Sequence, residues 1–144
     1  MTRTRPYEHR GSDLDKREEV AEFVKRFYRE IAQEGGFHLY FETIAQVDWR
    51  AHTLQLTDFW VDLLLGESLG RADDVIEAHR WLHDVAPFDA ELFARWVEIL
   101  DTTLDGGWTG PVADQARKRG HGYAWAMAKR LTGADLRTQP TPTA

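Results

Sequence analysis

Apolar residues recur every three or four positions along most of this chain, which is the spacing of one face of an α-helix. The clearest stripe starts near Asp13 and stops at Gly35-Gly36, and it predicts a first helix. The members of the stripe are Val20, Phe23, Val24, Phe27, Tyr28 and Ile31. We expect this face to be buried against other helices.

Four further stretches repeat the pattern, and glycine or proline separates them. The predicted helices cover 47–65, 73–84, 90–104 and 110–131. Gly66 ends the first of these, Pro87 breaks the second, and Asp89 is placed to cap the third. The aromatic stretch 37–45 reads as a short connection. Because no stretch alternates apolar and polar residues in the period of a strand, we predict an all-α fold.

A chain of 144 residues is long enough for one domain with one core. Residues 1–11 and the tail 132–144 are polar, and we expect both to be disordered. The domain is therefore expected to cover 12–131. The start of the chain has no apolar stretch behind its arginines and does not look like a signal peptide.

Charge and composition narrow the class of partner. Acidic residues outnumber basic ones 24 to 18, which argues against nucleic-acid binding. The longest apolar run, 59–65, is too short to cross a bilayer, so no membrane partner is expected. The sequence has no cysteine, which excludes disulfides and thiolate metal sites and suits a cytoplasmic protein.

Two histidines share apolar helix faces. His52 lies on the stripe with Trp49 and Phe59, and His79 lies with Val75 and other apolar residues. A single inward histidine is most simply a hydrogen-bonded core residue. Two of them, with a tyrosine and several tryptophans on separate helices, suit a flat aromatic cofactor with a central metal.

A zinc site is the alternative at the same place. His79 and His83 are four residues apart, a spacing at which two imidazoles can bind one zinc ion. No third ligand lies close in the sequence. For Tyr28 and Trp96, taken singly, a packing role in the core is the simpler interpretation.

Four segments in chain order resemble the truncated haemoglobins, most closely their third bacterial group. They are FVKRFYREI, DWRAHTLQLTDFWVDLLLG, AHRWLHDVAPFDAELFARWVEILDTTL and WTGPVADQARKRG. The resemblance covers about residues 12–131. It implies an all-α, globin-like fold, a truncated two-over-two helical sandwich around haem b.

The resemblance implies a role for each matching residue. His79 matches the proximal histidine that binds haem iron. Phe41, Phe59, Trp60 and Phe93 match residues that pack against haem. The distal pocket, where a gas would bind, is matched by Tyr28, His52, Trp96 and Phe27.

The sequence departs from the family before the proximal helix. Family members often carry a Gly-Asn-Pro turn there, whereas this chain has Asp73-Asp74-Val75. The start of that helix is therefore less defined, and His83 competes with His79 as the ligand. The distance of His79 from Trp96 along the chain favours His79. Candidate partners for the haem propionates are Arg71, Arg80 and Arg95.

The function implied by the resemblance is reversible binding of O2, CO or NO at haem iron. One alternative is enzymatic, as an NO dioxygenase or with peroxidase-like activity. That chemistry would need a separate reductase, because the sequence has no flavin or nicotinamide domain. The other alternative is a non-haem helical interaction module, or a zinc-binding one that uses His79 and His83.

Overall fold

The computed structural model describes residues 12–38, 40, 48–66, 79–80 and 82–137. Its helices are α1 (Arg17–Gln33), α2 (Gly35–His38), α3 (Trp49–Leu65), α5 (Ala90–Asp105) and α6 (Pro111–Thr132). Residues 79–80 and 82–85 are also helical. The prediction of an all-α fold is confirmed, and none of the described helices is long and apolar enough to span a membrane.

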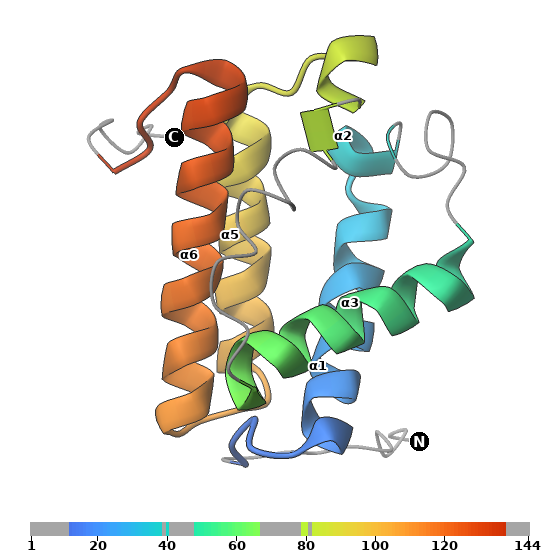
Figure 1. Cartoon of the computed structure of the whole chain (residues 1–144), viewed down its shortest axis with the longest axis vertical. Coiled ribbons are helices and arrows are strands. Elements are labelled where there is room, and N and C mark those ends of the chain that lie inside the picture. The colour runs from blue at the N-terminus through green and yellow to red at the C-terminus, as the bar shows by residue number, and fades with distance from the viewer. Residues whose placement is uncertain (1–11, 39, 41–47, 67–78, 81, 138–144) are drawn as a thin grey trace, which may run out of the picture.

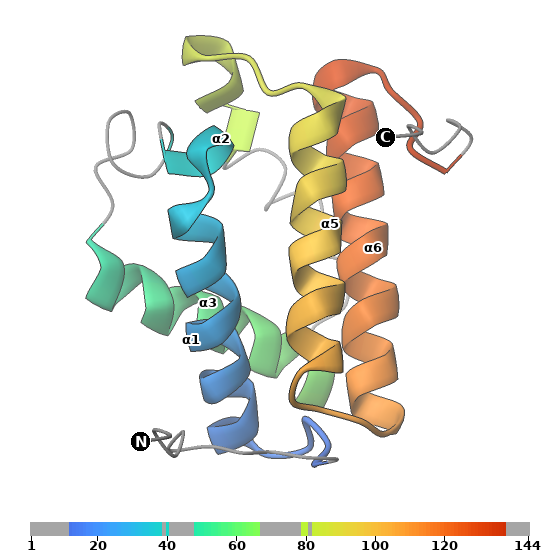
Figure 2. The same ribbon diagram turned by 180° about the vertical axis from the view of Figure 1, so that it is seen from behind.

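The helices form two packed pairs. Helix α3 crosses α1, and α5 and α6 run side by side in opposite directions, joined by a short turn (Figure 1). Helix α1 also packs on α5, so that it joins the two pairs, as the view from behind shows (Figure 2).

The main core is built on the stripe of α1 predicted from the sequence. All six residues of that stripe are buried. Phe23 lies at its centre, with ring centroids 5.3 Å from Trp60 of α3 and 5.8 Å from Trp108, both edge-on. Such aromatic pairs add to the stabilisation from burial alone. The predicted burial of this face is therefore confirmed.

A second, smaller cluster lies at the other end of α5 and α6. Its buried members are Phe88, Phe93, Met127, Ala128 and Leu131. Leu136 packs against it, so the packed part of the chain extends past the predicted boundary at residue 131. Residues 1–11 and 138–144, both predicted to be disordered, lie outside the described residues.

Helix ends follow the sequence at most boundaries. Asp48 caps α3 through the amides of Arg50 and Ala51, and Asp89 caps α5 through the amide of Leu92 at 2.9 Å. The first helix ends at Gln33, just before Gly35-Gly36, as predicted. Two predicted details are wrong, because α1 begins at Arg17 instead of near Asp13 and the start of the predicted connection 37–45 belongs to the short helix α2.

Asp13 has a different role, because it caps α6. Its carboxylate oxygens accept the amides of Val112 at 3.1 Å and Ala113 at 2.7 Å. The residue before α6, Gly110, has a φ of 132°, and a Cβ there would lie 2.5 Å from the Asp13 carboxyl carbon. Glycine is therefore required at 110, since it avoids both the strained backbone and the clash. The amide of Thr109 also donates a hydrogen bond to the backbone oxygen of Ser12 at 2.8 Å. We call these contacts of residues 12–13 with the start of α6 the clasp.

We expect Asp13→Ala to lower the free energy of unfolding by about 1–2 kcal/mol, since two amides at the start of α6 lose their acceptor. Urea denaturation followed by circular dichroism measures the change. Asp15→Ala, at an exposed position two residues away, is the matched control and should change stability little. Equal stabilities for the two variants would show that the clasp does not stabilise the fold.

Candidate functional site

Four of the residues selected from the sequence come together between α1, α3 and α5. Phe27 and Tyr28 of α1 lie with ring centroids 4.7 Å apart, and the Trp96 ring of α5 lies 5.0 Å from Phe27. Trp60 of α3 approaches the Tyr28 hydroxyl from another side. We call Tyr28, Trp60 and Trp96 the donor cluster, because each side chain carries an N–H or O–H donor.

The Tyr28 hydroxyl is buried in this cluster. Burial raises its pKa to about 12, and the indoles of Trp60 and Trp96 oppose that rise only in part. An indole N–H near the oxygen favours the phenolate, which explains the direction of their effect. Tyr28 is therefore a neutral phenol at physiological pH, and its proton is available for donation.

Trp60 carries the least satisfied polar group of the site. The side chain is 1% exposed, and its Nε1 has no hydrogen-bond partner among the described residues. Its approach to Tyr28 thus falls short of full hydrogen-bond geometry. Burying a hydrogen-bond donor without an acceptor costs about 1–3 kcal/mol of free energy. An acceptor placed near the Trp60 N–H would therefore stabilise the site.

His52 and His79 interact electrostatically although they come from different helical segments. Burial lowers the pKa of His52, a hydrogen bond with Gln55 opposes this, and positive charge on His79 lowers it further. The last effect requires the two rings to be within electrostatic range. His52 is half-buried, with its ring centroid 6.0 Å from that of Trp49. At pH 7 it is therefore neutral and can act as a metal ligand or hydrogen-bond partner.

His83, the competing candidate, is engaged by the backbone. Its Nδ1 accepts the amide of Phe88 at 2.9 Å, and its ring lies 5.6 Å from the Phe88 ring. A backbone N–H can only donate, so Nδ1 presents its lone pair and the proton of the neutral ring sits on Nε2. Binding a metal at Nε2 would require the loss of that proton or of the hydrogen bond. This geometry disfavours His83 as a ligand, alone or paired with His79.

The residues expected to pack against haem are divided between the two core clusters. Phe59 lies 6.0 Å from Trp60 and 5.5 Å from Tyr123, in the main core. Phe93 is buried in the second cluster, 5.7 Å from Phe88. Phe41 lies outside the described residues. These residues therefore pack in two different clusters of the core, and their contact with haem stays a prediction.

The three arginines proposed as partners of the haem propionates differ in their surroundings. Arg95 is bound by two carboxylates, Glu34 at 2.6 Å and Glu98 at 2.7 Å. The positive charge of its guanidinium is therefore already balanced by these two carboxylates. Arg80 is half-buried on the segment that carries His79, and Arg71 lies outside the described residues.

Sequence reasoning missed two aromatic residues beside the site. Tyr123 of α6 packs edge-on against Phe59, and Phe88 joins His83 to Phe93. A signal for Phe88 was present. It directly precedes the capping residue of α5, and Phe93 is the fourth helical residue, which is the spacing of a hydrophobic staple.

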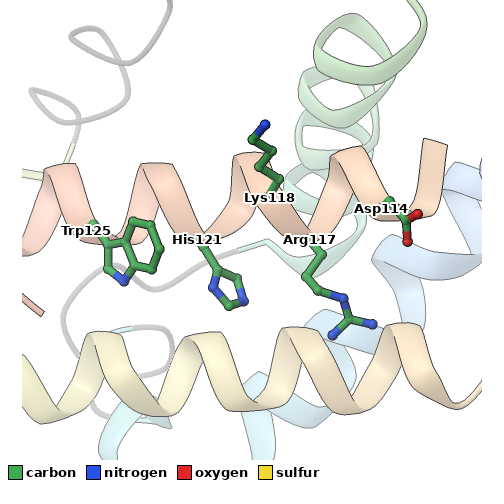
Figure 3. A pocket seen from close by; sticks show the side chains of 5 residues that line it. All are labelled: Asp114, Arg117, Lys118, His121 and Trp125. Atoms are coloured by element: carbon green, nitrogen blue, oxygen red, sulfur yellow. The ribbon is translucent and has the colours of Figure 1, made fainter. Parts of the chain in front are cut away.

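A pocket on the surface of α6 lies apart from this site. Figure 3 shows its side chains along one helix, above α5, and they are Asp114, Arg117, Lys118, His121 and Trp125. Arg117 forms ion pairs with Asp101 and Asp105 of α5, and His121 contacts Asp101 at 2.8 Å. None of the five lining residues belongs to either core cluster.

No cluster of three or more potential metal ligands occurs among the residues that the structure describes. The zinc alternative, which needs a third ligand beside His79 and His83, thus gains no support from these residues.

Comparison with known proteins identifies similar globins. No family model matches the chain. The group 3 truncated haemoglobin of Campylobacter jejuni is 23% identical over 91 residues, which cover 61% of this chain and 68% of that protein. The crystal structure of a group III truncated haemoglobin from Campylobacter jejuni superposes with a TM-score of 0.68 at 20% identity. It covers 85% of this chain and 95% of that one. The chain therefore has the fold of a truncated haemoglobin, and the resemblance found in the sequence is confirmed.

Proposed function

We propose that this chain, with the fold of a truncated haemoglobin, binds haem b through His79 and holds O2, CO or NO beside the donor cluster. One observation carries the proposal. Two helical segments place His52 and His79 within electrostatic range, although 27 positions separate them in the sequence. A structural role for each histidine alone would not require this electrostatic interaction between them.

The donor cluster supports the same proposal. Its three side chains offer two indole N–H groups and one hydroxyl, while the Tyr28 oxygen is the only side-chain acceptor that these three residues possess. Even if both indole N–H groups donate to that oxygen, the Tyr28 hydroxyl proton is left without an acceptor among the three side chains. A small electron-rich ligand would supply the missing acceptor. The residues present therefore fit a haem with a gas bound to it.

Haem iron, when bound, supplies a coordination position for a diatomic gas. The protein's residues supply the rest. His79 provides the imidazole nitrogen that anchors the cofactor. Tyr28 and Trp96 donate hydrogen bonds, and half-buried His52 is placed either to gate entry of the gas or to bind the iron itself when no gas is present. The buried aromatic side chains around Phe27 exclude water. The proposed compartment is the cytoplasm.

Titration of the purified apoprotein with haemin tests the proposal. We expect one haem per chain and a Soret band, with distinct ferric, ferrous and CO-bound spectra. Zinc should not bind at comparable concentrations. Zinc binding without haem binding would contradict the proposal and support the zinc alternative.

His52→Leu separates the two roles proposed for His52. If His52 binds iron, the ferric spectrum of the parent is typical of two histidine ligands, and the substitution abolishes that spectrum. A five-coordinate or water-bound iron that His52→Leu leaves unchanged would exclude direct coordination. Arg50→Leu, at an exposed position in the first turn of α3, is the control for a general effect on the helix.

A further inference from the structure

The side chain of Trp60 is held firmly but leaves its N–H without a partner. Phe23 contacts the indole edge-on, with ring centroids 5.3 Å apart, and Phe59 contacts it at 6.0 Å. A Cβ built on Gly120 would lie 3.4 Å from the indole ring, and the side chain is almost fully buried. Because the ring is enclosed in this way, Trp60 cannot swing outward to hydrogen-bond with water.

Tyr28 carries the acceptor that its neighbours lack. The side chains of Phe23, Phe59 and Gly120 contain no acceptor oxygen, whereas Tyr28 presents a buried phenolic oxygen that Trp60 and Trp96 both approach. A phenol oxygen has two lone pairs and one proton, and an indole has a donor only. The Tyr28 oxygen can therefore accept from both indoles at once, while its own proton remains available for donation.

We propose that Trp60 is a positioning residue for Tyr28. Its indole N–H donates to the phenolic oxygen, and with Trp96 it occupies the acceptor capacity of Tyr28. The Tyr28 hydroxyl proton must then point away from both indoles, toward the gas. This inference rests on the proposed function and assigns to Trp60 a role other than packing against haem.

The consequence is that Tyr28 acts as a donor and does not alternate between donating and accepting. An unconstrained hydroxyl rotates to suit its partner, so it would accept as readily as it donates. A hydroxyl held by two donors discriminates between ligands, because it stabilises those that carry negative charge. Trp60 would thus determine gas selectivity without contacting the gas.

Nuclear magnetic resonance of the indole N–H groups tests the hydrogen bond directly. The six tryptophans give six indole signals in a ¹H–¹⁵N spectrum, and Trp60→Phe, or contacts to Phe59, identifies that of Trp60. Tyr28→Phe removes a single oxygen. We expect it to move the Trp60 signal upfield in both the apoprotein and the diamagnetic CO form.

Two other tryptophans are internal controls. Trp108 donates to Glu19 at 2.8 Å and shows the shift of a fully bonded indole, while Trp125 lies on the surface pocket of α6. Neither signal should respond to Tyr28→Phe. If the Trp60 signal moves no more than these two, the proposed hydrogen bond does not exist. Because the apoprotein suffices, a failure to bind haem would overturn only the proposed function.

A double-mutant cycle tests the functional half of the inference. In the parent, Trp60→Phe should speed O2 release about 5-fold, because Tyr28 is no longer held as a donor. In the Tyr28→Phe background, the same substitution should have no further effect. Equal effects in both backgrounds would overturn the proposal, since they would mean that Trp60 acts on the gas directly or only through packing.

Discussion

Replacing His79 by alanine is expected to remove most of the haem from the protein or to leave it weakly held with altered coordination. The imidazole–iron bond is the main directional anchor of the cofactor, so its loss leaves packing contacts alone. Haem content per chain and the Soret spectrum measure the effect. In His79→Gly, added imidazole should restore a spectrum close to that of the parent, because it replaces the missing ligand.

His83→Gln is the matched control for this experiment. A glutamine oxygen can still accept the Phe88 amide that His83 Nδ1 accepts in the structure, so local packing should survive. We expect this variant to keep the haem content and spectrum of the parent. Haem loss from His83→Gln, with retention in His79→Ala, would reverse the assignment of the iron ligand.

Tyr28→Phe is expected to speed O2 release by about 10- to 100-fold and to change CO release little. A hydrogen bond to a charged acceptor is worth about 1.5–3 kcal/mol, and each 1.4 kcal/mol is about tenfold in rate. Bound O2 carries partial negative charge and bound CO much less, so the donor distinguishes them. Trp96→Phe should act in the same direction but more weakly. Stopped-flow measurement of both gases gives the rates.

Tyr40→Phe is the control for the loss of a tyrosine hydroxyl. Tyr40 donates to the backbone oxygen of Pro87 at 3.0 Å and lies against the second core cluster. Its substitution should leave both release rates unchanged. Equal changes for O2 and CO in Tyr28→Phe would indicate a steric effect.

Slow O2 release from the parent would favour redox chemistry or sensing over O2 delivery.

Local signals in the sequence were sufficient for most of the fold. The stripe of α1 has a single spacing and a single buried face, so its six positions could be assigned before the structure. Asp89 stands where a cap belongs and caps α5. The short helix α2 was not predicted, because the weak helix propensity of Gly35-Gly36 argues against helical structure there.

Contacts between distant segments could not be predicted in this way. The role of Asp13 as a cap depends on α6, about 100 positions away, and nothing in the sequence near Asp13 indicates it. The sequence favoured His79 over His83 but left the choice open, because the start of that helix is not defined by a Gly-Asn-Pro turn. It became clearer only when one ring was found to accept a backbone amide. The unsatisfied N–H of Trp60 likewise depends on three-dimensional packing.

The clasp between residues 12–13 and the start of α6 has a consequence for the nascent chain. A ribosome makes the N-terminal segment first, yet the amides that Asp13 accepts belong to residues 112 and 113. Helix α1 and its apolar stripe must therefore wait through most of translation before the contact that secures their N-terminal end can form. Chains stalled before α6 emerges would lack this contact and would expose the face of α5 that packs on α6, and they should be the species that chaperones bind and that aggregate.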